Sequence, residues 1–215
     1  MKRSLSALLA AVLQQYPDVR RDQKFGRDSL FWPMIAELKG VVESLPVLVD
    51  SKRARVKVSF GQGNWAEVPN IAIMDGRETE RPSAGLYLVF LLRADASAWV
   101  LSLNQGSADL IFEMKHRAHA VLRTRADRLR GALDVGALAA AGFTDTPLEL
   151  ASKGEYPRAY AEGNVVSKAY GADAMPSNED LLRDLSVLHR AYLSVIPSSR
   201  LRPPVPGRYV PQGRP

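Results

Sequence analysis

The chain has 215 residues, of which 46% are hydrophobic, and this is enough to bury a sizeable core in one domain. It contains no Cys, which excludes disulfides and thiolate metal sites, and no apolar run approaches the ~20 residues that cross a bilayer. The formal net charge of +6 favours polyanionic partners, with basic clusters at 52–57 and 115–130.

Two helices are expected first. The start of the chain, two basic residues and then an apolar stretch, resembles a short signal peptide, but Gln14, Gln15 and Tyr16 follow in place of a small-residue cleavage site, and a helix is predicted over 3–15. An amphipathic helix is therefore the preferred interpretation of this segment. A second helix is predicted over 28–45, with Pro33 near its start, where a missing backbone N–H costs little.

The hydrophobic period then changes to that of strands. Val56, Val58 and Phe60 alternate with polar residues, which is typical of a half-buried strand. Residues 85–95 are nearly all apolar and are expected at the centre of a sheet. Further strands are predicted at 70–75, 98–106, 148–152 and 165–171. Together these elements predict an α/β (α+β) fold, a mixed, largely antiparallel twisted sheet of about four to six strands flanked by helices, in a single domain.

The second half of the chain is expected to be mainly helical. A long helix is predicted over 107–133, and a last helix over 178–196 begins after Ser177, a suitable N-cap. Residues 154–164, GEYPRAYAEGN, are expected to form a loop with two Tyr. Residues 197–215 contain six of the 14 prolines, so a Pro/Arg-rich disordered tail or linker is expected after a domain at 1–196.

The turn Gly61–Asn64, GQGN, admits three interpretations. A nucleotide cradle is disfavoured, because the turn lacks both the Lys of a P-loop and the third Gly and following helix of a Rossmann loop. A plain hairpin explains the glycines, which tolerate positive φ. It does not explain Gln62 and Asn64, whose amides would project from the tip. A device that reaches into a nucleic acid is the third interpretation.

Catalytic and metal-binding patterns are weak in this sequence. Asp75, Glu78 and Glu80 fall in a predicted loop where two Arg balance their charge. His116 and His119 are spaced i,i+3 on a predicted helix, without a third ligand in the sequence pattern. We therefore expect no catalytic residues, no metal and no cofactor, and we keep a stand-alone nuclease only as a third functional hypothesis.

Several stretches resemble a known family. They are similar to the N-terminal DNA-binding domain of the McrB subunit of modification-dependent, type IV restriction systems, and to related domains that precede AAA+ motors or nuclease domains. The similarity is strong over 52–106 and weaker over 154–170. The stretches that carry it are RVKVSFGQGNWAEVPNIAIMD (55–75), GLYLVFLL (85–92), VLSLNQG (100–106) and GEYPRAYAEG (154–163).

The resemblance implies a domain that recognises methylated cytosine in duplex DNA by flipping the base into a pocket. By position, Tyr87 and Leu91 would line this pocket and Tyr160 would close it near the cytosine methyl group. Trp65 and Asn70 are further pocket candidates. The loop that would enter the DNA where the base has left consists of Gly61, Gln62, Gly63 and Asn64.

Two positions depart from the pattern of the family. Its best-known member has an aromatic residue at the position of Gln62, and an amide cannot fill a vacated base stack as a ring does. The same member has a Trp at the position of Asn70, so a roomier or more polar pocket is expected here.

The sequence therefore predicts a cytoplasmic, non-enzymatic specificity module. The expected partners are double-stranded DNA that contains modified cytosine and AAA+ GTPase or ATPase motor and nuclease subunits or domains, with no membrane. An adaptor that recruits such a motor or nuclease, with weak or non-specific DNA binding, is the alternative. The residues expected to contact phosphates are Lys52, Arg53, Arg55, Lys57, Arg123 and Arg158.

Overall fold

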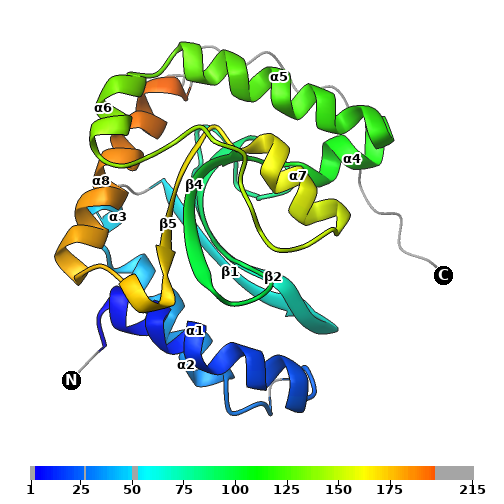
Figure 1. The fold of residues 1–215 in the computed structure, drawn as a ribbon, viewed down its shortest axis with the longest axis vertical. Helices are drawn as coiled ribbons and strands as arrows, with labels where there is room; N and C mark the ends of the chain where they lie inside the picture. Colours follow the sequence, from blue (N-terminus) through cyan, green and yellow to red (C-terminus); the bar gives the residue numbers. More distant parts are fainter. Residues whose placement is uncertain (1–2, 27, 50–52, 197–215) are drawn as a thin grey trace.

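Five antiparallel strands lie in one sheet in the order in which the chain forms them, β1-β2-β3-β4-β5 (Figure 1). The computed structural model describes residues 3–26, 28–49 and 53–196. The predicted fold class, an antiparallel sheet flanked by helices in one domain, is confirmed. The predicted tail, 197–215, lies outside the described residues, and the domain boundary at 196 stays a prediction.

The elements have the following bounds. The strands are β1 (Ala54–Gln62), β2 (Asn64–Asp75), β3 (Leu86–Leu92), β4 (Ala98–Gln105) and β5 (Val166–Gly171). The longer helices are α1 (Leu5–Asp22), α2 (Trp32–Glu43), α5 (Ala118–Gly131), α7 (Glu155–Gly163) and α8 (Asn178–Val195). The short helices are α3 (Pro46–Val49), α4 (Ala108–Met114), η1 (Lys115–Arg117), α6 (Val135–Ala140) and η2 (Ala172–Ala174).

Helices α1, α2 and α8 cover one face of the sheet, and α7 lies over the other (Figure 1). The first face holds the main core, in which Phe90 and Trp99 of the sheet pack among helix residues. The Trp99 indole Nε1 donates a hydrogen bond to the Leu9 carbonyl at 3.0 Å. Because both faces are covered, β3 and β4 are buried along their whole lengths, as the apolar run at 85–95 predicts.

Helix α1 extends beyond its predicted end. Its buried positions continue at helical spacing through Tyr16 and Val19, on either side of Pro17. Burial of these side chains therefore outweighs the hydrogen bond that a Pro inside a helix removes. The helix continues to Asp22, and its C-terminal end reaches the β1–β2 hairpin.

Three local predictions are wrong. The single helix predicted over 107–133 is broken at Lys115, where φ is +52°, and α4 and α5 pack on each other across this break. The strand predicted at 148–152 is an extended segment outside the sheet, held by the Leu150 carbonyl, which accepts from the Ala94 N–H at 2.9 Å. Residues 155–163 form helix α7 instead of a loop, since Pro157 falls in the first turn, where its missing N–H costs little.

The pairing of the β1–β2 hairpin is irregular close to its tip. Pairing is regular up to Ser59 opposite Asn70, and it resumes with Gly61 opposite Trp65, so β2 carries extra residues in a bulge. Pro69, which has no N–H to donate, falls in this bulge and interrupts no ladder bond. The bulge explains the spacing of Asn64 and Pro69 in the sequence, and it turns the distal part of the hairpin relative to the sheet.

Candidate nucleic-acid interface

The sheet brings three of the predicted pocket residues to one face. Ser59, Asn70 and Leu91 are paired in one row across β1, β2 and β3. Tyr87 lies four residues before Leu91 in β3, so its side chain points to the same face. This is the face that α7 covers, and it buries a cluster that includes Tyr87, Val89 and Leu91.

Tyr160 of α7 packs over Tyr87. Tyr87 is only 1% exposed, and Tyr160 is a partly buried neighbour of the same cluster. The two phenol groups lie close enough to interact electrostatically. Burial is the main reason that the pKa of Tyr87 lies well above 10.0, and it also raises the pKa of Tyr160. Both phenols therefore stay neutral at physiological pH and can donate as well as accept hydrogen bonds.

A buried polar network fixes the position of Tyr160. Asn104 Nδ2 donates to the Tyr160 carbonyl and to Ser102 Oγ, at 3.0 Å each. Ser102 Oγ donates in turn to Asn164 Oδ1 at 2.7 Å, directly after α7. Gly163 lies so close that an added Cβ would stand 2.8 Å from Asn104 Oδ1. Because buried amides need their partners, this network ties the C-terminal end of α7 to β4.

Asn70 is the polar residue beside this apolar surface. Its side chain is half-buried, and no described residue forms a hydrogen bond with it. Ser59, which the sequence analysis did not single out, lies opposite it on β1. The alternation at 55–60 contained this signal, since it places Ser59 on the same face as Lys57. The face thus combines two phenols, an apolar floor, an unpaired amide and a hydroxyl.

Trp65 is not brought to this face. Its indole Nε1 donates to the Gln23 carbonyl at 2.8 Å, at the C-terminal end of α1. Its ring packs edge-on against Phe25 with centroids 5.0 Å apart, and it belongs to the core on the helix-covered side. Further rings surround it, namely Tyr16, Phe31 and Trp32. Trp65 falls on the same side of β2 as Ile71 and Ile73 by strand alternation, and it braces the hairpin from the side of α1.

The hairpin tip projects from this braced base. Gln62, Gly63 and Asn64 are all exposed, and Gln62 pairs with Asn64 across the turn. Gly61 has φ +134°, and a Cβ at this position would stand 1.9 Å from the Asn64 carbonyl oxygen. Only glycine fits this backbone. The tip therefore has a fixed shape, which presents two amide side chains to solvent.

The predicted phosphate contacts divide between the sheet edge and two helices. Arg55 and Lys57 pair with Met74 and Ala72, which lie on the face of Tyr87. The two basic side chains therefore share that face. Arg53 precedes β1 and is exposed, as is Arg158 on α7. Lys52 lies outside the described residues.

Arg123 differs from the others because it already has a partner. Its guanidinium lies 3.3 Å from a Glu162 carboxylate oxygen, in an ion pair that links α5 to α7. The Arg123 side chain is 61% exposed, so the pair is worth at most about 1 kcal/mol. A phosphate at this position would have to compete with Glu162.

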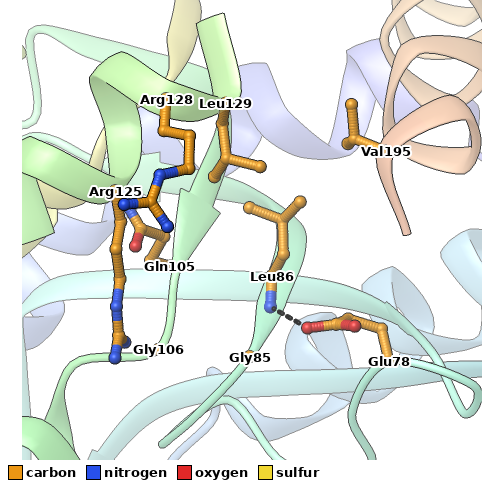
Figure 2. Close-up of a pocket in the computed structure, with 9 residues that line it drawn as sticks. All are labelled: Glu78, Gly85, Leu86, Gln105, Gly106, Arg125, Arg128, Leu129 and Val195. Atoms are coloured by element: carbon orange, nitrogen blue, oxygen red, sulfur yellow. Dashed lines mark hydrogen bonds between the residues drawn. The ribbon is translucent and has the colours of Figure 1, made fainter. Parts of the chain in front are cut away.

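A separate cavity of ≈ 310 Å³ lies between α5, the end of α8 and the β2–β3 connection (Figure 2). Arg125 and Arg128 reach into it from α5, and across it Glu78 accepts a hydrogen bond from the Leu86 N–H at 3.2 Å. Leu86 and Tyr87 are neighbours in β3 with side chains on opposite faces, so this cavity is distinct from the surface around Tyr87.

Residues 11–196 match the MrcB-like, N-terminal domain family. No curated protein is significantly similar to the chain. In the described part of the chain, no three His, Asp or Glu side chains gather to hold a metal ion. The helices of that part are too short or too polar to cross a membrane.

Proposed function

The chain belongs to the MrcB-like N-terminal domain family, a DNA-binding module of restriction systems, and from this premise we propose that it recognises modified cytosine in duplex DNA by base flipping. The modified base would bind at the surface formed by Tyr87, Leu91, Asn70 and Tyr160. The module would supply specificity, and a motor and a nuclease on other domains or subunits would supply the cleavage.

The observation that carries the proposal is the pairing of Tyr87 with Tyr160 on the face that also holds Arg55 and Lys57. An aromatic pair next to exposed basic side chains on one surface is the combination that stacks a nucleobase and binds the neighbouring phosphates. Flipping a base costs a few kcal/mol, and stacking on an aromatic side chain returns about 1–3 kcal/mol. In this structure Tyr160 lies against Tyr87 and closes the surface. The flipped base would therefore move the Tyr160 ring aside and then stack on it.

The same surface offers separate groups for the two sides of cytosine. Leu91 and Val89 are fully buried and form an apolar floor for a methyl group. Burial of one methyl is worth only about 1 kcal/mol, so discrimination against unmodified cytosine is expected to be several-fold. The Asn70 amide, which lacks a partner in the described structure, would pair with the polar edge of the base.

The hairpin tip would occupy the space that the base leaves in the duplex. Gln62 and Asn64 carry amides that both donate and accept, so they can bond to the orphaned guanine. Hydrogen bonding by these amides differs from insertion of an aromatic ring into the vacated base stack. The arrangement therefore favours recognition of the opposite base by hydrogen bonds.

Competition binding on otherwise identical duplexes tests the proposal. Duplexes with unmodified, 5-methylated, 5-hydroxymethylated and N4-methylated cytosine are compared at moderate salt, with a fluorescent base analogue beside the target as a reporter of flipping. The wild type should prefer a modified duplex and raise the fluorescence. Tyr160→Ala should lose both effects. Tyr156→Ala, on the same helix but 56% exposed, is the matched control.

Equal binding of all four duplexes by the wild type, with no fluorescence change, would refute recognition by base flipping. In that case the adaptor hypothesis is tested by recovery of a partner ATPase or nuclease from a nuclease-treated lysate.

A further inference from the structure

A second concave surface lies on the other side of the hairpin tip. This cavity of ≈ 480 Å³ is formed between the C-terminal end of α1 and the tip. Its polar and basic character distinguishes it from the surface around Tyr87. The residues that line it are Arg20, Gln23, Lys24, Phe25, Gly63, Asn64 and Trp65.

Positive charge dominates this cavity. Arg20 and Lys24 are both exposed, and none of the lining residues is acidic. The two acids of the same helix end, Asp18 and Asp22, are occupied by Arg21, at 2.7 and 2.8 Å. Arg20 makes only a long hydrogen bond, 3.3 Å, to the Ala94 carbonyl, so its charge is not balanced by a carboxylate among the described residues.

The hairpin and the end of α1, which together form the cavity, are joined by direct contacts. The hydrogen bond from Trp65 Nε1 to the Gln23 carbonyl joins the hairpin to the end of α1. The edge-on packing of Trp65 with Phe25 and Tyr16 supports the same joint. A cation on α1 is therefore held at a constant distance from the tip, as a binding group next to an inserted loop needs to be.

The tip lies between two basic flanks. Figure 1 shows the tip of the β1–β2 hairpin, the C-terminal end of α1 and the N-terminal end of α7 on the same side of the molecule. Close contact on the α7 side is evident at Gly154, where an added Cβ would stand 3.4 Å from the Glu67 carboxylate of β2. Arg158 is exposed on α7, and Arg20 and Lys24 are exposed on the opposite flank.

We propose that the Arg20–Lys24 cavity binds a DNA backbone phosphate, so that the inserted hairpin is clamped from both sides. The inference rests on the proposed insertion of the hairpin into DNA. A groove is bounded by a phosphate backbone on each side, about 6 or 12 Å apart in B-DNA, so a loop that enters it has phosphates on both flanks. The site reads no base, and it sets the position of the tip.

The test measures affinity for one modified and one unmodified duplex over a range of salt concentrations. The double variant Arg20→Gln with Lys24→Gln should bind both duplexes about tenfold more weakly near 0.1 M salt. The slope of log affinity against log salt should fall by about 1 to 2, because up to two phosphate contacts are lost. The preference for the modified duplex should be unchanged, since the pocket is intact.

The matched control removes the same charge from arginines that already have acidic partners. Arg21→Gln with Arg183→Gln alters Arg21, bound to Asp18 and Asp22, and Arg183, bound to Glu179 and Asp180. This variant should keep the wild-type slope. If both double variants lower the affinity and the slope equally, only net charge matters and the clamp is refuted. Melting temperatures verify that both variants fold.

Failure of this inference can be told from failure of the proposed function. Loss of preference in Tyr160→Ala, with an unchanged salt slope in the Arg20 and Lys24 variant, refutes the clamp alone. Equal binding of modified and unmodified duplexes by the wild type, with a reduced slope in this variant, refutes modified-base recognition and leaves the clamp standing. Absence of DNA binding by the wild type refutes both.

Discussion

The phenol groups of Tyr87, at the centre of the sheet, and Tyr160, on the helix above it, interact electrostatically in a buried setting. The contact joins two parts of the chain that are 73 residues apart (160 − 87). It closes the surface where we propose that a flipped base binds. A base that enters must therefore replace this contact with stacking and with contacts to Asn70.

Tyr87→Phe should lower the stability of the protein, and it should make the loss of stability at alkaline pH less steep. Loss of the buried hydroxyl and of its contact with Tyr160 is expected to lower the free energy of unfolding by about 1 kcal/mol at pH 7. The pKa of Tyr87 is raised above 10.0 by burial, so its contribution is complete below pH 10 and is lost as the pH rises above it. Urea unfolding at several pH values from 8 to 11 should therefore show a steeper alkaline loss in the wild type than in the variant. Identical curves would contradict a buried, neutral Tyr87.

Gly61→Ala should disrupt the hairpin, whereas Gly63→Ala should be mild. At Gly61 an added Cβ would meet the Asn64 carbonyl oxygen at 1.9 Å, and φ is +134°. At Gly63 φ is +77° and no atom lies within 4 Å of the added Cβ. We expect a loss of more than about 2 kcal/mol for the first variant and about 1 kcal/mol for the second. Chemical denaturation measures this difference, and equal losses would argue against the observed turn.

Asn104→Ala and Asn70→Ala should separate stability from recognition. Asn104 is fully buried and forms hydrogen bonds with the Tyr160 carbonyl, Ser102 Oγ and the Gln105 N–H. Its loss should therefore lower the free energy of unfolding by about 2–4 kcal/mol. Asn70 has no partner among the described residues, so its loss should cost less than about 0.5 kcal/mol. At temperatures where both variants are folded, Asn70→Ala should weaken binding of modified duplexes without an accompanying loss of stability. A stable Asn104→Ala protein would refute the role of the network.

Arg158→Gln should affect DNA binding more than Arg123→Gln does. Arg158 forms no ion pair in the described structure, while Arg123 is held by Glu162 at 3.3 Å. Loss of one phosphate contact should reduce the slope of log affinity against log salt by about 1. We expect this reduction for Arg158→Gln and a smaller one for Arg123→Gln. The reverse order would mean that the Glu162 pair opens when DNA binds.

Local periodicity was sufficient to predict much of the sheet. The alternation at 55–60 and the apolar run at 86–92 predicted β1 and β3 correctly, because the period of side chains along a strand depends only on the backbone. Ser177 was a correct N-cap, with its hydroxyl accepting from the Asp180 N–H. The segments that were wrong, 107–133, 148–152 and 154–164, depend on contacts that are distant in sequence.

The candidate site shows the same division. The spacing of residues alone shows that Tyr87 and Leu91 share a face, that Arg55 and Lys57 alternate with apolar residues, and that a glycine turn joins β1 and β2. By contrast, the folded chain was needed to show that residues 155–163 are a helix held by Asn104, which places Tyr160 over Tyr87. The contact between the hairpin and the end of α1, where Trp65 Nε1 donates to the Gln23 carbonyl, likewise depends on tertiary packing. Strand period is a local property of the backbone, whereas a bulge and a buried polar network depend on which segments pack together.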